Sequence, residues 1–378
     1  MKALRNYLDK IKPNFEEGGK LAMFRSVFEG FETFLFVPST TSKSGVHIHD
    51  YIDSKRTMTV VIIALLPALL FGMYNVGYQH NLAVGADPGF LMTFIFGFLA
   101  VLPKIIVSYV VGLGIEFAVA QVKKEEIQEG FLVSGILIPM IVPVDTPLWM
   151  IAVATAFAVV FAKEVFGGTG YNVFNVALVT RAFLFFAYPA AMSGDQVFVR
   201  TADTFGIGGG QVVDGFSGAT PLGQVAIAGK ELIGSFQAVD VLGNPMTTWD
   251  MFLGLIPGSI GETSVLAILI GAVMSLIFNM IGTTVAMCVS PLDHLFLGGF
   301  AFGAVFMATD PVTSARTETG KYIYGFLVGA MAIIIRALNP GYPEGMMLAI
   351  LLMNVFAPLI DYYVVEANIN RRLKRVIK

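Results

Sequence analysis

The chain has 378 residues, of which 56% are hydrophobic and 13% are charged, and its formal net charge is -3. This composition excludes a water-soluble globule and indicates a polytopic membrane protein, while the small net charge excludes a basic surface for nucleic acid. The one cysteine, Cys288, and the four histidines exclude a disulfide scaffold and are too few for an iron–sulfur cluster or a closed zinc site, so any metal-based electron transfer would have to occur on a partner.

Residues 1–56 are rich in lysine and arginine and are predicted to form a cytoplasmic segment. Within it, Phe24 to Val37 is apolar and aromatic but is interrupted by Glu29 and Glu32, so we expect an interfacial helix and not a span. No cleavable signal peptide is visible, and the first span is expected to direct insertion.

Residues 57–190 are predicted to form a first set of five helices. The second is long enough for one tilted helix or for a helix broken at Pro103, and the third is only half a span. The five segments are Thr57 to Val76, Phe90 to Val122, Phe131 to Val144, Leu148 to Phe161 and 173–190.

Residues 191–250 are a polar loop that contains the stretch Asp214-Gly-Phe-Ser-Gly-Ala-Thr220, which follows the glycine-rich run Gly206 to Gly210. Five crossings from a cytoplasmic start place this loop in the periplasm. Because the residues around Thr220 are small, a bulky phosphorylated ligand could approach the backbone and its phosphate could esterify the hydroxyl. Taken alone, the same composition is typical of a solvated loop.

Residues 251–364 are predicted to form a second set of five helices, and the basic segment 365–378 a cytoplasmic tail. An even number of crossings is needed to return the chain to the cytoplasm, which gives about ten in total. The segments are Met251 to Ile260, Ser264 to Met280, Gly282 to Met307 with a break near Ser290-Pro291, Tyr322 to Leu338 and Met346 to Val364.

The two sets of helices share weakly similar sequence motifs at corresponding positions. Leu65-Leu-Pro67 opens the first set as Leu255-Ile-Pro257 opens the second, and Val144-Asp-Thr-Pro147 and Ala308-Thr-Asp-Pro311 each close a short half-span. An odd number of spans per repeat inverts the second copy. We therefore predict an all-α polytopic membrane protein with two inverted five-helix repeats; the alternative is that proline and glycine simply kink independent helices.

Five separated blocks of sequence occur in the order found in a known family. They resemble the B subunit of the bacterial sodium-translocating NADH:quinone oxidoreductases, whose fold is similar to the urea and ammonium channel architecture. The D subunit of the Rnf complex shares the flavin motif and the fold, but the long polar start favours the B subunit. The blocks are Lys163-Glu-Val-Phe-Gly-Gly-Thr-Gly-Tyr-Asn172, Arg181-Ala-Phe-Leu-Phe-Phe-Ala-Tyr-Pro189, Ile256-Pro-Gly-Ser-Ile-Gly-Glu262, Phe306-Met-Ala-Thr-Asp-Pro311 and Asn339-Pro-Gly-Tyr-Pro-Glu-Gly-Met-Met347.

The resemblance implies two flavins on this chain. In the family, a separate flavin transferase joins FMN by a phosphoester bond to the last residue of Ser217-Gly218-Ala219-Thr220, which makes Thr220 the attachment site. It also implies that riboflavin is held near Asn172 and Asn175, for which helix capping is the simpler interpretation. Phe183 and Phe185 are implied to lie near flavin or quinone, although such aromatic residues ordinarily face the core or lipid.

The resemblance further assigns Glu116, with Gly112 before it, to the quinone site and the sodium route. Leu113 stands where the family often has a second glycine, which puts the shape of that pocket in question. A carboxylate at this depth must face protein, water or a cation, or reach the interface. Asp310 and Asp361 are further candidates for the ion path, as is Glu29 on the cytoplasmic side; a helix-terminal role for Asp310 and an interfacial position for Asp361 are the alternatives.

The resemblance therefore implies one subunit of a six-subunit, redox-driven sodium pump in the bacterial inner membrane. Its implied partners are a second subunit with covalent FMN, iron–sulfur subunits, the flavin transferase, ubiquinone or menaquinone, and sodium. Two alternatives stay open: a D-type subunit of an Rnf complex, and a channel or transporter of the urea and ammonium type without a redox role.

Overall fold

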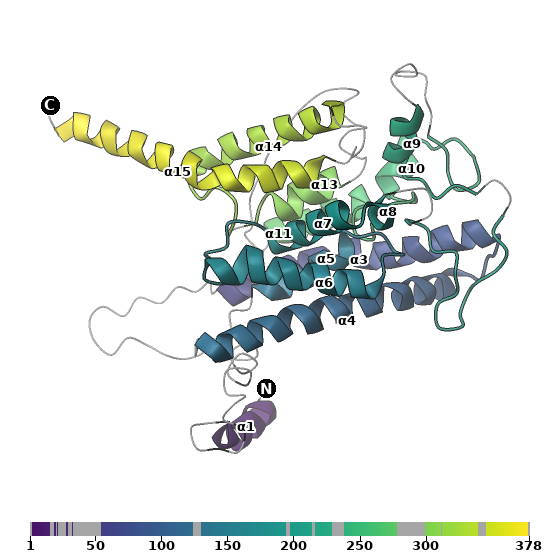
Figure 1. Ribbon diagram of the computed structural model, residues 1–378, viewed down its shortest axis with the longest axis horizontal. Coiled ribbons are helices and arrows are strands. Elements are labelled where there is room, and N and C mark those ends of the chain that lie inside the picture. The colour runs from purple at the N-terminus through teal and green to yellow at the C-terminus, as the bar shows by residue number, and fades with distance from the viewer. Residues whose placement is uncertain are drawn as a thin grey trace.

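The computed structural model of the chain is a bundle of helices, with several long helices lying along one common direction in Figure 1. Within the described residues there is no β-strand, only isolated bridges between Thr204 and Ile207 and between Val239 and Pro245. The described residues are 2–15, 19, 21, 28, 32, 54–123, 130–193, 197–213, 216–228, 238–277, 299–310, 312–338 and 345–376.

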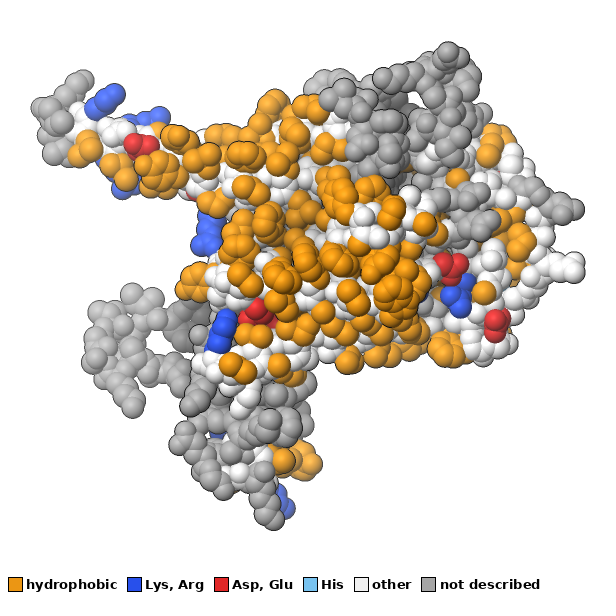
Figure 2. All heavy atoms as spheres, in the orientation of Figure 1, with side chains coloured by type: hydrophobic (Ala, Val, Ile, Leu, Met, Phe, Trp, Pro, Cys, Tyr) orange, Lys and Arg blue, Asp and Glu red, His pale blue; other side chains and the backbone are white. Residues whose placement is uncertain are grey.

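Five helical stretches in the described part of the chain are long and apolar enough to cross a membrane. A crossing takes about 20 predominantly apolar residues, because each residue advances a helix by about 1.5 Å. Figure 2 shows hydrophobic side chains covering the middle of the molecule, with charged side chains toward its two ends. The stretches are Met58–Val84, Phe90–Lys123, Leu148–Phe166, Glu318–Ile335 and Met346–Lys374.

The first half of the bundle contains the five predicted segments. Helix α4 runs through Pro103 without a break, so the predicted alternative of a single continuous helix is confirmed and the broken helix is not. Helix α3 continues two turns past the predicted end, where Asn81 Nδ2 donates to Thr93 Oγ1 at 2.7 Å. The elements are α3 (Ser54–Val84), α4 (Phe90–Lys123), α5 (Phe131–Met140), α6 (Leu148–Ala158), the π-helix η3 (Val159–Lys163), the 3-10 helix η4 (Glu164–Phe166), α7 (Val176–Ala187) and α8 (Pro189–Met192).

The predicted span Met251 to Ile260 is wrong. Helix α10 (Thr248–Leu253) ends at Gly254, which adopts a left-handed backbone with φ 93° that favours glycine. A Cβ at this position would lie 2.4 Å from Ser264 Cα, so the chain folds back on itself here. Residues 254–264 are a non-helical segment, and the next helix is α11 (Val265–Ile277).

The remaining predicted segments are described in part. The end of the segment Gly282 to Met307 is helical, whereas its expected break near Ser290-Pro291 lies outside the described residues. Helix α15 continues to Val376, so most of the predicted tail 365–378 is helical and extends the last span. The elements are α13 (Phe300–Phe302), the π-helix η6 (Gly303–Met307), α14 (Glu318–Leu338) and α15 (Met346–Val376).

Different parts of the chain lie at the two ends of the bundle. In Figure 1 the C-terminal end of α15 lies at the left, whereas α9 (Pro221–Ala228) and α10 lie toward the opposite end. The N-terminal segment contains α1 (Lys2–Ile11) and the 3-10 helix η1 (Lys12–Asn14), while most of the predicted interfacial helix Phe24 to Val37, including Glu29, lies outside the described residues. The loop with Thr220 is therefore at the other end of the molecule from the C-terminus.

Candidate functional site

Thr220 immediately precedes helix α9 and is half-buried. Its hydroxyl oxygen accepts a hydrogen bond from the Gly223 amide at 3.1 Å, which is the arrangement of a helix N-cap. The Gln224 side chain donates to the carbonyls of Ala219 at 3.0 Å and Val239 at 2.8 Å, which fixes the loop around Thr220. An ester oxygen would still accept the Gly223 hydrogen bond, so esterification of Thr220 is compatible with the cap.

The residues before Thr220 are closely packed. Gly218 and Ala219 are buried, and the Ser217 hydroxyl accepts from the Ala219 amide at 3.5 Å. The glycine-rich run is held to α3, where the Gly209 amide donates to His80 Nε2 at 3.3 Å. Of the two hydroxyls in this motif, that of Thr220 is therefore the one placed at a helix start.

Asn175 and Asp310, predicted as parts of different sites, lie together. Asn175 Oδ1 accepts from the amides of Ala177 and Leu178 at 3.0 and 3.2 Å, so the residue caps α7 as the simpler interpretation expects. Its Nδ2 donates to Asp310 Oδ2 at 3.0 Å, which links the start of α7 to the loop before α14. Asp310 also accepts from the Thr313 hydroxyl at 2.8 Å.

The other residues named for riboflavin make local contacts. Asn172 Oδ1 accepts from the Gly170 amide at 3.3 Å, and its Nδ2 donates to the Phe174 carbonyl at 3.0 Å. The ring of Phe183 lies 4.7 Å from that of Phe157, and Phe185 lies 5.5 Å from Phe186. The contacts of Asn172 order the turn before α7, and Phe183 and Phe185 pack against the hydrophobic core.

Glu116 on α4 forms a buried ion pair with Lys163 at the end of the π-helix η3. Sequence reasoning missed this partner, although a lysine in an apolar span is itself a signal that a carboxylate is near. One turn away, Gly112 packs on the ring of Phe131, where a Cβ would lie 1.9 Å from Cζ. The pair and the glycine thus share one face of α4 against α5 and η3.

A second buried ion pair, which the sequence also did not predict, joins Arg181 in α7 to Glu262 in the non-helical segment 254–264. Both residues are almost fully buried, and neither charge could remain at this depth without compensation. The pair ties the second half of the bundle to the first.

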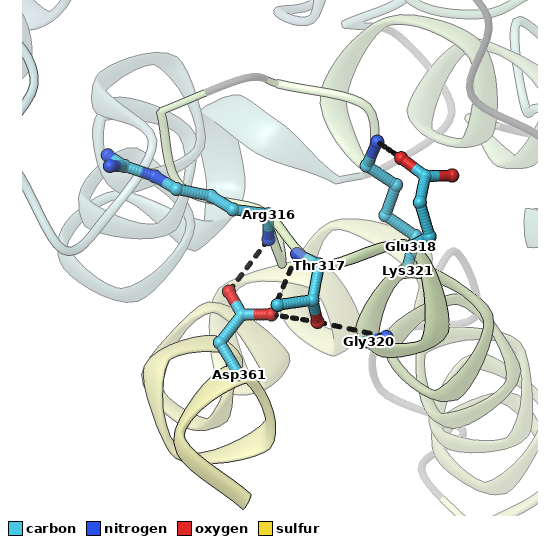
Figure 3. A network of polar contacts seen from close by, with 6 residues as sticks. All are labelled: Arg316, Thr317, Glu318, Gly320, Lys321 and Asp361. Atoms are coloured by element: carbon cyan, nitrogen blue, oxygen red, sulfur yellow. Dashed lines mark hydrogen bonds and ion pairs between the residues drawn. The ribbon is translucent and has the colours of Figure 1, made fainter. Parts of the chain in front are cut away.

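Asp361 lies where α15 passes the start of α14 (Figure 3). Its carboxylate accepts from the Arg316 amide at 2.7 Å, the Thr317 amide at 3.0 Å and the Thr317 hydroxyl at 2.6 Å. The side chain of Arg316 points away from the carboxylate in Figure 3. Asp361 therefore satisfies amides that the start of α14 leaves unpaired.

Comparison with known proteins gives one consistent result. Residues 41–370 match the family described as NQR2, RnfD, RnfE. The chain is similar to the B subunit of the Na(+)-translocating NADH-quinone reductase of Ectopseudomonas mendocina, with 43% identity over 98% of this chain and 99% of the relative. The protein of the same name from Chromohalobacter salexigens is 42% identical over 98% of this chain and 96% of the relative.

Proposed function

Because the chain belongs to the NQR2, RnfD, RnfE family, we propose that it is the membrane-embedded B subunit of a sodium-translocating NADH:quinone reductase. The observation that carries this proposal is the 42–43% identity, over 98% of the chain, to relatives that bear that name. Its helices fit the role, since five of those described are long enough to cross a membrane. The relatives favour this B subunit over an Rnf subunit and over a channel without a redox role.

We propose that Thr220 carries FMN through a phosphoester bond made by a flavin transferase, and that Asn172 and Asn175 help to hold riboflavin. The half-buried hydroxyl of Thr220, its small neighbours and its compatible N-cap support the first assignment. The amide side chains at the start of α7, with Phe183 and Phe185 on the same helix, support the second. Bound flavins would supply carriers that exchange one electron at a time, while the protein positions them.

We propose that Gly112 and Glu116 border the site of ubiquinone or menaquinone, and that Glu116, Asp310 and Asp361 line the sodium path with Glu29 at its cytoplasmic entry. Hard oxygen ligands suit sodium. Asp310 and Asp361 already accept several hydrogen bonds, so a sodium ion would compete with those donors for the carboxylate oxygens. The proposed partners include a second subunit with covalent FMN and the iron–sulfur subunits of the complex.

Replacing Asp310 by asparagine tests both the function and this ion path. The substitution removes a charge but keeps the shape, so the sodium concentration for half-maximal quinone reduction should rise by about tenfold. The measurement is NADH-dependent quinone reduction by the assembled complex against sodium concentration, with flavin content determined in the same preparation. Asp250→Asn, at a capping residue of the short helix α10, is the control and should leave the titration unchanged.

Two results would count against these assignments. A wild-type complex whose quinone reduction does not respond to sodium would contradict the function itself. A normal sodium titration in the Asp310→Asn complex would show only that Asp310 is structural.

We also propose an even number of membrane crossings, divided between two inverted repeats, in the bacterial inner membrane. Their proposed division is 57–190 and 251–364, with a periplasmic loop 191–250 between them and cytoplasmic ends at 1–56 and 365–378. The position of α9 opposite the end of α15 in Figure 1 supports this topology.

Labelling of introduced cysteines tests the topology. In a Cys288→Ser background, cysteines at Ser39 and Lys378 should react only from the cytoplasm, and one at Gln211 should react with an impermeant reagent from the periplasm. Gln211 is a suitable position because it is exposed. Cytoplasmic labelling of the cysteine at Gln211 would contradict an odd number of crossings before the loop.

A further inference from the structure

The non-helical segment 254–264 lies deep within the bundle. The Ile260 carbonyl packs on Gly72, where a Cβ would lie 1.8 Å from the oxygen, and Gly72 is near the midpoint of the span Met58–Val84. The next residue, Gly261, donates its amide hydrogen to the Met140 carbonyl at 2.7 Å, at the end of the short helix α5. In a membrane, irregular backbone at this depth occurs only where it is buried in protein or lines a cavity.

Two hydroxyls of this segment have no hydrogen-bond partner among the described residues. They belong to Ser259, which is 1% exposed, and Thr263, which is 3% exposed. A buried hydroxyl without a partner costs about 1–3 kcal/mol. Because both groups lie within one short buried segment, a single bound species could satisfy them together.

The two hydroxyls belong to one compact turn. The Glu262 amide donates to the Ser259 carbonyl at 3.1 Å, which closes the turn. The Thr263 side chain folds back on Gly258, where a Cβ would lie 2.9 Å from the Thr263 methyl carbon. Both oxygens therefore project from a loop of six residues, 258–263.

The dipoles around the turn favour a small cation, and the charged side chains beside it balance each other. The ion pair of Glu262 with Arg181 places a carboxylate in the turn and balances the guanidinium charge. The C-terminal end of α5, which carries the negative end of a helix dipole, meets the turn at Met140. Unwound backbone beside a half-length helix offers carbonyl oxygens of the kind that coordinate sodium in transporters.

We propose that the turn 258–263 binds a dehydrated sodium ion in the middle of the membrane, with Ser259 Oγ and Thr263 Oγ1 as two of its ligands. The proposal rests on the proposed function, because it takes sodium as the transported ion. The site joins the two halves of the bundle, since α3, α5 and α7 all contact the segment that carries it. An ion held here would therefore stabilise one arrangement of the halves.

Removal of the two hydroxyls tests the site in the assembled complex. Ser259→Ala and Thr263→Val should each raise the sodium concentration for half-maximal quinone reduction by about five- to tenfold, because each removes one ligand. A second readout does not depend on activity: the rise in thermal unfolding midpoint on adding sodium chloride in place of choline chloride should shrink in both variants.

Thr180→Val is the matched control. Thr180 is fully buried, but its hydroxyl already donates to the Val176 carbonyl at 2.9 Å within α7. This variant loses a hydroxyl of the same type at a site one residue before Arg181. It should keep the wild-type sodium titration and the wild-type response to sodium chloride.

The outcomes separate the site from the function. The site is overturned if quinone reduction by the wild type depends on sodium but Ser259→Ala and Thr263→Val both keep the wild-type sodium titration. The proposed function is overturned if quinone reduction by the wild type does not respond to sodium. If loss of a hydroxyl prevents assembly of the complex, the variant Thr263→Ser tests the ligand role instead. It keeps the hydroxyl oxygen but removes a methyl group, which enlarges the space around the oxygen. A ligand role then predicts a changed preference between lithium and sodium, and an unchanged preference overturns the proposal.

Discussion

Replacing Thr220 by alanine is expected to remove all covalent flavin from this chain while leaving its insertion in the membrane intact. The substitution deletes the only oxygen through which a phosphoester could form at this position, and it also removes an N-cap of a short helix at the surface of the bundle. Loss of such a cap costs about 1 kcal/mol, which is small for a membrane bundle of this size. Flavin fluorescence of the subunit in a denaturing gel is the measurement.

Two further variants sharpen this result. Ser217→Ala removes the neighbouring hydroxyl of the motif and should leave the fluorescence unchanged. Thr220→Ser retains a hydroxyl at the helix start and should give partial labelling at best. Full fluorescence in the Thr220→Ala chain would move the attachment to another residue.

The second large effect is expected from Glu116→Gln, which leaves the buried ammonium of Lys163 without its carboxylate. Breaking one partner of a buried ion pair costs about 3–5 kcal/mol, because the remaining charge is not compensated. The variant should therefore lower the thermal unfolding midpoint of the complex. It should also raise both the sodium concentration and the quinone concentration needed for half-maximal activity.

The double variant Glu116→Gln with Lys163→Met separates structure from function. It removes both charges, so most of the lost stability should return, because no uncompensated charge is left in the bundle. If Glu116 serves the quinone and the ion, the kinetic defects should persist after stability returns. Recovery of normal sodium and quinone titrations together with stability would show that Glu116 has only a structural role.

Long apolar runs made much of the bundle predictable. The run from Phe90 to Val122 became α4 almost unchanged, because an apolar helix of that length satisfies all of its backbone groups internally. The prediction of a membrane span at Met251 to Ile260 failed for a local reason. This run is as apolar as a span, but Gly254 ends α10 and the chain then packs between α3 and α5, where other residues satisfy its backbone.

The sequence predicted which kinds of polar residue lie in the apolar helices, but it did not predict which residues they contact. A carboxylate in an apolar helix was expected to face protein, water or a cation, and Glu116 faces Lys163, which is 47 residues away in the sequence. Asp361 illustrates the same limit, because its role at the start of α14 depends on amides 44 and 45 residues away. Such pairs are set by how the helices pack, which local patterns do not encode.

The attachment of flavin to Thr220 is the central claim about this chain, and mass spectrometry of the peptide that contains it tests the claim most directly. The complex would be purified from a host that makes the flavin transferase, and this subunit digested and sequenced by fragmentation. The predicted result is a peptide spanning Ser217 to Gln224 whose mass is increased by one FMN less one water, with the addition located on Thr220. An unmodified Thr220 in that preparation, or an FMN located on Ser217, would contradict the assignment.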